Sequence, residues 1–420
     1  MRTFMEFAQK RWIALIAAMV CAFFSGVIYT WSVYVIPLSN KYHWSTAEIS
    51  FAYTLNIIFS AIIPIVFAKL RAKMKIRNYN FIGACVYGAG MLYLSIMWGS
   101  IWELYLGFGV LVGGGIGFIY VSLVAYVVEL FPDRKGLAAG LYTAAYGAAA
   151  LIWAPLANSI IQSTGDVSMA FRYLGIIMTV VVLVGTRFLF DIPTDWTGPS
   201  ISTTQASGNT AKPSPGPVSE SSPREMLVSP LFYVTWIMFI LGLISGSMIL
   251  ALGSPLLQGS LGWNETRAAL VVGFFAVAQT VGRLFWGWIS DRLGRINVIT
   301  IVGAITVLAM FLLAYVRTET LYILAILCVP MAYGAYASML SPITAETFGS
   351  KKFPNNYNVI FTAFAFAALI GPQLVAYVKK TSGGYQGAFI YALIFAAIAI
   401  LLSFAYRYLA NKERAKIPLS

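Results

Sequence analysis

An arginine, Arg283, lies inside a long apolar stretch that begins near Ala268 and ends in GRLFWGWISDRLGR at residues 282–295. It stands about seven residues, or roughly 10 Å of helix, before the polar end of that stretch. Burying an arginine at such a depth costs about 2.5–3.5 kcal/mol on membrane-insertion scales. All the aspartates and glutamates fall in loops or near the ends of apolar stretches, so none offsets this cost at the same depth. A guanidinium binds a carboxylate through two parallel hydrogen bonds, and we therefore interpret Arg283 as the binding group for an anion.

The alternative is a structural arginine, which extends to the lipid headgroups or pairs within the protein. Side chains on a helix tilt toward its N-terminus. If this stretch runs from outside to inside, the guanidinium of Arg283 points toward the middle of the membrane, which favours anion binding. Gln279 lies one turn earlier on the same face. Its amide either orients the guanidinium, binds a substrate oxygen, or only packs.

Tyrosines inside other apolar stretches are further candidates, because the ring walls an apolar cavity while the hydroxyl donates to a carboxylate. They are Tyr29, Tyr34, Tyr120, Tyr142, Tyr146, Tyr333 and Tyr336. Of these we favour Tyr29, Tyr120, Tyr333 and Tyr336 as substrate-binding residues. Asn56, in the polar patch YTLN, is another candidate. The alternative for each is a residue that only packs or lies at the membrane interface.

The elements that would position these side chains are membrane-spanning helices. The chain has 420 residues, 59% hydrophobic and 10% charged, with a mean hydropathy of +0.79, whereas soluble chains carry about 25% charged residues. Apolar runs of roughly 20 residues, long enough to span the hydrocarbon core, recur along the chain. The sequence predicts an all-α membrane protein with twelve spans. They are 12–38, 46–70, 77–98, 101–129, 135–162, 168–190, 229–257, 264–290, 295–315, 318–344, 354–378 and 385–410.

Composition also predicts the domain organisation and the orientation. Residues 196–226 are rich in Ser, Thr, Pro and Gly, which is typical of a flexible linker. We expect an N-terminal six-helix bundle over 1–190, a linker over 191–228 and a C-terminal six-helix bundle over 229–420. With both termini inside, 21 of the 28 lysines and arginines fall on the cytoplasmic side and 6 outside, leaving Arg283 in the interior. This bias predicts a multi-pass protein of the plasma (cytoplasmic) membrane with both termini in the cytoplasm.

The same residues argue against an enzyme. The three cysteines, Cys21, Cys85 and Cys328, lie in apolar spans, and the single histidine, His43, lies in a loop. They form no metal-ligand spacing, and no nucleophile and base are paired in the sequence. We therefore expect no catalytic residue, no metal and no cofactor. The net charge of +13 follows from the membrane topology and does not indicate nucleic-acid binding.

The two halves of the chain resemble each other. ELFPDRKG (129–136) corresponds to ETFGSKKF (346–353), and AKLRAKMKIRN (68–78) corresponds to GWISDRLGRIN (287–297), at offsets of 217 and 219. Two six-span repeats around a midplane site are typical of secondary transporters. GWISDRLGRIN also resembles the loop signature of the major facilitator superfamily, carried by Gly287, Asp291, Arg292 and Arg295. The resemblance implies that these residues control conformational gating. The N-terminal copy has Ala72 in place of the aspartate, so no such latch is expected there.

A narrower resemblance is to the oxalate/formate antiporter family, relatives of the monocarboxylate porters. It rests on SGVIYTWSVYVIP (25–37), GGIGFIYV (114–121), ELFPDRKGLAAG (129–140) and GRLFWGWISDRLGR. In that family an arginine of the eighth span and a lysine of the eleventh bind oxalate between aromatic residues. Arg283 matches the arginine, whereas Phe364 stands in place of the lysine and packs apolar substrate or fills space. Tyr29 and Tyr120 lie in the matching segments.

One buried cation among aromatic rings suits one carboxylate with a short apolar tail. The sequence therefore predicts a secondary active transporter of small monocarboxylates, of the lactate, pyruvate or formate class, which works as a monomer by alternating access. The alternatives are an oxalate/formate-type dicarboxylate exchanger and a non-transporting membrane sensor. The porters place an aspartate where this chain has Gln279, so we expect no protein carboxylate as the obligatory proton carrier. The partner in transport is then a counter-anion or a proton that travels with the substrate.

Overall fold

The computed structural model describes residues 2–193, 196, 218–316, 318–349 and 352–415, which contain helices and no β-strand. In the first part of the chain the helices are α1 (Arg2–Ser25), η1 (Gly26–Thr30), α2 (Trp31–Tyr42), α3 (Thr46–Val66), α4 (Ala68–Lys73), α5 (Ile76–Leu94), α6 (Ile101–Leu104), η2 (Tyr105–Val112), α7 (Gly113–Ile116), η3 (Gly117–Val121), α8 (Ser122–Leu130), α9 (Lys135–Thr164) and α10 (Val167–Thr186). In the second part they are α11 (Pro223–Val228), α12 (Pro230–Leu261), α13 (Glu265–Leu293), α14 (Arg295–Tyr315), α15 (Glu319–Phe348), α16 (Phe353–Ser382) and α17 (Gln386–Arg414).

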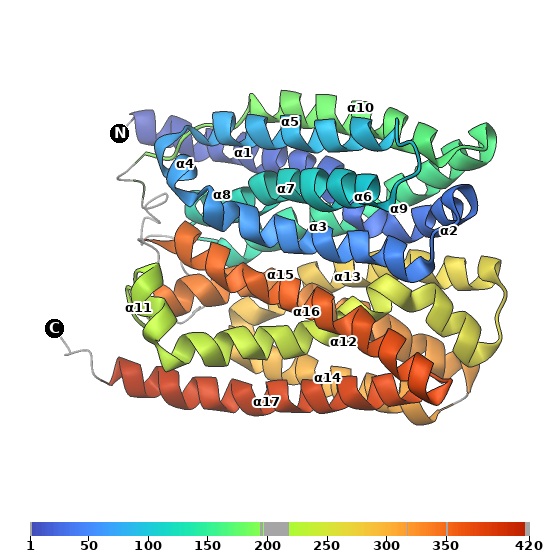
Figure 1. The fold of residues 1–420 in the computed structure, drawn as a ribbon. Helices are drawn as coiled ribbons and strands as arrows, with labels where there is room; N and C mark the ends of the chain where they lie inside the picture. Colours follow the sequence, from blue (N-terminus) through green and yellow to red (C-terminus); the bar gives the residue numbers. More distant parts are fainter. Residues whose placement is uncertain (1, 194–195, 197–217, 317, 350–351, 416–420) are drawn as a thin grey trace.

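These helices form a membrane bundle. Among the described residues, ten helices are long and apolar enough to cross a membrane. The other two long helices, α5 and α13, run through the same bundle (Figure 1). Both carry buried polar residues, among them Asn80 on α5 and Arg283 on α13. The predicted all-α membrane fold is confirmed, and most helix ends lie within a few residues of the predicted ones.

The first predicted span is broken in the structure. Residues Gly26–Thr30 form a short 3-10 turn between α1 and α2. A Cβ atom on Gly26 would lie 2.5 Å from the Cβ of Ala149 and 2.7 Å from the carbonyl oxygen of Tyr146. The turn therefore approaches α9 as closely as glycine alone permits. Tyr29 belongs to this turn, so the break positions its side chain.

The helices up to α10 form one group and α12–α17 form a second group beside it (Figure 1). We call these groups the first half and the second half. Both chain termini lie at the same end of the bundle, here called the terminus end, and the opposite end is called the far end. The two groups match the two repeats that the sequence suggested.

Part of the predicted linker is packed, which corrects the expectation of a flexible segment over 196–226. Val218 is buried, and its N–H donates to the carbonyl of Glu346 at 2.9 Å. The helix α11 buries Met226 completely. These apolar side chains give residues 218–228 a surface to bury on the second half. Residues 197–217 of the linker lie outside the described residues.

The two halves meet through α9 and α13 on one side and α3 and α16 on the other. Gly136, Gly140 and Gly147 of α9 all approach α13, so the helix backbones lie close together. On the other side, Asn358 Nδ2 donates to the carbonyl of Pro64 at 3.1 Å. Both contacts bring the halves together toward the terminus end.

Candidate substrate site between the halves

Arg283 is fully buried between the two halves. Its Nη1 donates to the carbonyl oxygen of Thr143 on α9, and its Nη2 donates to Tyr29 Oη at 2.8 Å. A longer contact of 3.3 Å joins Nη2 to Gln279 Oε1, one turn earlier on α13. The Nε atom has no hydrogen-bond partner. All three acceptors are neutral, so no carboxylate among these partners balances the charge of the buried guanidinium.

The side chain of Arg283 points toward the middle of the bundle. A Cβ atom on Gly140 would lie 3.7 Å from the Arg283 carbonyl oxygen, whereas one on Gly147 would lie 3.0 Å from Nη1. These two glycines are about two turns, or roughly 10 Å, apart along α9. The guanidinium therefore lies farther from the terminus end than its own backbone. This direction agrees with the tilt expected on a helix that runs toward the terminus end.

A cavity of about 40 Å³ lies beside this arginine. Its walls are mostly aromatic and come from both halves: Tyr29, Tyr53, Tyr120, Tyr146, Tyr333, Phe361 and Phe364. The rings contact one another, with centroids 4.2 Å apart for Tyr120 and Tyr146 and 5.8 Å apart for Tyr333 and Phe364. Three isoleucines and Ser60 complete the lining.

Arg283 does not line the cavity, but Tyr29 contacts both the cavity and the arginine. Tyr29 lines the cavity and also accepts the hydrogen bond from Arg283 Nη2. Its ring lies 5.5 Å from the guanidinium carbon. Tyr29 therefore lies between a ligand in the cavity and the guanidinium to which it is hydrogen-bonded.

Two of the predicted substrate-binding residues lie elsewhere. Tyr336 is buried inside the second half, where its ring packs against Gly242 and lies edge-on to Phe239 at 5.8 Å. Asn56 donates through Nδ2 to the carbonyl of Phe108 at 2.7 Å, inside the first half. Neither residue lines the described cavity. The other predicted residues, which are Arg283, Gln279, Tyr29, Tyr120, Tyr333 and Phe364, lie together at the site.

The site also contains residues that we had not singled out. Thr143 contributes a backbone carbonyl, for which no side-chain pattern gives a signal. Phe361 lies one turn before Phe364 on the same helical face, so the spacing could have found it. Tyr53 lies one turn before Asn56, and the direction in which α3 faces the cavity decides between these two.

A second polar cluster lies where the halves meet at the terminus end. Arg295 forms ion pairs with Asp291 at 2.5 Å and with Glu346 at 3.2 Å, and it also donates to Ser290 Oγ. A Cβ atom on Gly136 of the first half would lie 2.5 Å from Asp291 Oδ1. The carboxylate of Asp291 therefore lies against the N-terminal end of α9, where the helix dipole favours a negative charge.

The other two predicted gating residues contribute differently. Gly287 is buried one turn before Asp291, and its carbonyl accepts from Ser290 Oγ at 2.7 Å. Arg292 packs its guanidinium over the ring of Trp288, with the guanidinium carbon 4.1 Å from the ring centroid. The described ion pairs of the cluster are thus made by Arg295.

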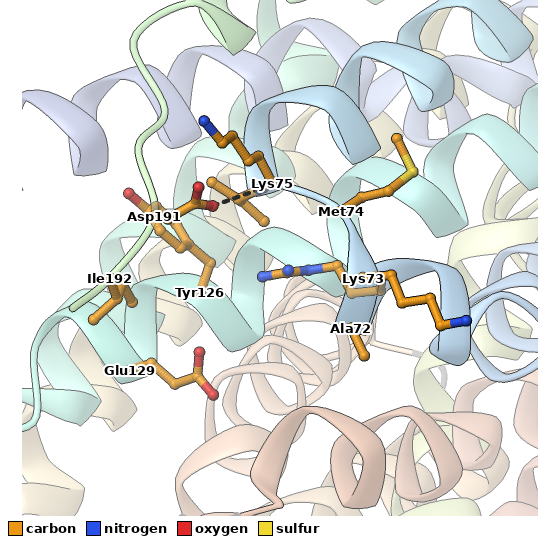
Figure 2. A pocket seen from close by; sticks show the side chains of 10 residues that line it. Ala72, Lys73, Met74, Lys75, Tyr126, Glu129, Asp191 and Ile192 are labelled. Carbon is orange, nitrogen blue, oxygen red and sulfur yellow. Dashed lines mark hydrogen bonds between the residues drawn. The ribbon is translucent and has the colours of Figure 1, made fainter. Parts of the chain in front are cut away.

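The corresponding place in the first half is a cavity of about 370 Å³ (Figure 2). At an offset of 219, Ala72 replaces Asp291 and Ile76 replaces Arg295, and at an offset of 217 Glu129 corresponds to Glu346. The structure describes no ion pair for Glu129. Figure 2 shows the ammonium groups of the lining residues Lys73 and Lys75 pointing apart. The halves therefore differ at this place, with an ion-pair cluster in the second half and a cavity in the first half.

The helical bundle of two halves, with a buried cation between them, defines an integral membrane transporter. A family model described as Major Facilitator Superfamily matches residues 15–372 and, in a second match, 235–419. The chain belongs to this superfamily.

Individual proteins agree with this assignment. The chain is 27% identical over 398 residues to the oxalate:formate antiporter of Oxalobacter formigenes, covering 94% of this chain and 91% of that one. It is 24% identical over 340 residues to monocarboxylate transporter 12 of Mus musculus, covering 76% and 69%. The fold matches FucP, a Major Facilitator Superfamily transporter in the outward conformation, with a TM-score of 0.71, 14% identity and coverage of 94% and 99%.

Proposed function

We propose that the chain transports small organic monocarboxylates by alternating access, with Arg283 binding the carboxylate. The observation that carries the proposal is the burial of this arginine between the halves with only neutral acceptors. A buried charge without a counter-ion is costly, and a substrate carboxylate would supply that counter-ion. Guanidinium and carboxylate also match in geometry, because both present two parallel hydrogen-bonding atoms.

The cavity favours a small substrate with an apolar tail. Its lining is aromatic or aliphatic apart from the tyrosine hydroxyls and Ser60. Its volume of about 40 Å³ is far below the roughly 300–1,000 Å³ of drug-sized pockets. With the carboxylate on Arg283, a methyl or similar group would occupy the side walled by Phe361 and Phe364. Lactate and pyruvate have this shape, and formate is the smallest member of the class.

The lining also favours one carboxylate over two. It contains no lysine or arginine, and Phe364 stands in place of the lysine expected for a dianion site. A second carboxylate would then lose its hydration without gaining a charged partner. Because one relative is named an oxalate:formate antiporter, the test includes oxalate.

We favour exchange of one anion for another, driven by the gradient of the counter-anion, over transport with a proton. Gln279, which accepts from Arg283, has no titratable group to carry a proton at the site. The excess of lysine and arginine at the terminus end favours a cytoplasmic position for that end. The protein then takes up or exchanges its substrate across the cytoplasmic membrane as a monomer.

Counterflow in proteoliposomes tests the proposal. Vesicles loaded with unlabelled lactate, pyruvate, formate or oxalate receive the same labelled anion outside at low concentration. The expected result is transient accumulation with the three monocarboxylates and little with oxalate. Accumulation with oxalate alone would favour the dicarboxylate exchanger, and no accumulation with any of the four would contradict transport of this substrate class.

A further inference from the structure

We propose that Arg283 is also a latch between the two halves. In the empty protein its guanidinium is held by acceptors of the first half, and a bound carboxylate replaces these acceptors and releases the latch. The identity of the releasing ligand rests on the proposed function, whereas the latch itself rests on the geometry alone.

Two hydrogen bonds of Arg283 cross between the halves. The arginine belongs to α13 of the second half, while Thr143 belongs to α9 and Tyr29 to η1 of the first half. Few other described side-chain hydrogen bonds cross the halves, and the one from Asn358 to Pro64 lies nearer the terminus end. Opening the terminus end separates α9 from α13 and must break the bonds of Arg283. Each bond from a charged donor resists that separation.

The acceptor on α9 is a bare stretch of helix backbone. In an α-helix the carbonyl of Thr143 accepts from the N–H of Gly147, four residues later. Gly147 carries no side chain, so the guanidinium reaches this carbonyl from the side. A Cβ atom there would lie 3.0 Å from Nη1 and 3.1 Å from the guanidinium carbon. A side chain at this position would therefore crowd the guanidinium against its acceptor.

A carboxylate competes for the same donors. The present acceptors are a carbonyl, a phenol and an amide, all neutral, and hydrogen bonds to a charged acceptor are about twice as strong. The unpaired Nε of Arg283 adds a donor that the latch leaves unused. A carboxylate that enters from the cavity displaces Tyr29 and takes the guanidinium from the first half. The empty protein is thus held closed at the terminus end, and the loaded protein is free to open.

This arrangement favours exchange over net flux. A carrier whose empty form is latched returns slowly without substrate, whereas its loaded form changes state in both directions. The latch therefore supplies a reason for coupling that requires no titratable side chain at the site.

Gly147→Ala, with the larger Gly147→Val beside it, crowds the guanidinium in the latch without altering any donor or the cavity lining. Gly140→Ala is the matched control, because it lies on the same helix, also faces α13, and its Cβ would make only an ordinary contact of 3.7 Å with the Arg283 carbonyl oxygen. Spin labels at Arg134→Cys and Asn297→Cys, in a cysteine-free background, report the distance between the halves at the terminus end. Both positions are exposed.

Without any anion, the wild type and Gly140→Ala are expected to show one short-distance population. Gly147→Ala should raise a longer-distance population about tenfold, which corresponds to about 1.4 kcal/mol, and Gly147→Val should raise it at least as much. Identical distance distributions in all four proteins would overturn the latch. This result needs no substrate, so it stands apart from the proposed function.

Adding pyruvate to the wild type should produce the same longer-distance population, and the ratio of net efflux to exchange should rise several-fold in Gly147→Ala. Opening of the empty Gly147→Ala protein with no response to lactate, pyruvate, formate or oxalate would keep the latch and refute the substrate class. Normal pyruvate exchange with an unchanged efflux ratio and unchanged distances in Gly147→Ala would keep the substrate class and refute the latch.

Discussion

Replacing Arg283 by glutamine separates the binding role of this residue from a structural role. A glutamine is neutral and shorter, so the substrate carboxylate loses a buried, charge-assisted pair, a change that costs about 2–5 kcal/mol. The apparent affinity for pyruvate is expected to fall by roughly 30-fold to 4000-fold. Arg283→Lys should also lose most of the transport, because an ammonium lacks the planar two-point geometry of the guanidinium.

The same substitution should leave the protein folded. Arg283 has no carboxylate among its described partners, so its loss strands no buried negative charge. Removing an arginine from the interior recovers about 2.5–3.5 kcal/mol of insertion cost, which offsets lost hydrogen bonds worth about 1.5–3 kcal/mol each. Because the recovered cost offsets these lost bonds only in part, we expect the free energy of unfolding to fall by a few kcal/mol and the protein still to fold.

The assay measures initial rates of labelled pyruvate exchange over a range of concentrations, together with thermal unfolding of the purified protein in detergent. Near-normal exchange by Arg283→Gln would refute the assignment of the anion site. Loss of exchange together with aggregation would show that the arginine is needed for folding, which contradicts the reasoning from its neutral partners.

Three further predictions concern the cavity lining, the terminus end and the two corresponding glutamates. Phe364→Lys should increase oxalate exchange relative to pyruvate exchange by about tenfold or more, and an unchanged ratio would mean that this position does not face the substrate. Gly136→Ala should loosen the terminus end, because its Cβ would lie 2.5 Å from Asp291 Oδ1; spin-label distances equal to the wild type would contradict this. Glu129→Gln and Glu346→Gln, made separately, should each retain pyruvate exchange, and abolition by either one would show that a protein carboxylate carries the coupling proton.

The fold was predictable because apolar runs and the distribution of charges can be read from the local sequence. The break at Gly26–Thr30 was not predictable in the same way. Its residues are apolar and continue the hydrophobic run, and what forces the turn is contact with α9, more than a hundred residues later in the chain. Residues 218–226 show the opposite case, because a polar composition hid two buried side chains, Val218 and Met226.

The residues of the site also differ in how well the sequence predicts them. Arg283 and Gln279 stood out because charge and polarity are rare in an apolar stretch, and their spacing of four residues placed them on one face. The tyrosines were harder to sort, since Tyr333 and Tyr336 lie one turn apart on α15 while only the first lines the cavity. Thr143 takes part through its backbone, and only the packing of α9 against α13 shows that role.

A structure of the protein with pyruvate bound tests the central claim most directly. Our account predicts that both carboxylate oxygens lie about 2.7–2.9 Å from nitrogen atoms of Arg283, with Tyr29 moved from its present contact and the methyl group toward Phe361 and Phe364. Pyruvate bound elsewhere, with Arg283 still hydrogen-bonded to Thr143 and Tyr29, would contradict it.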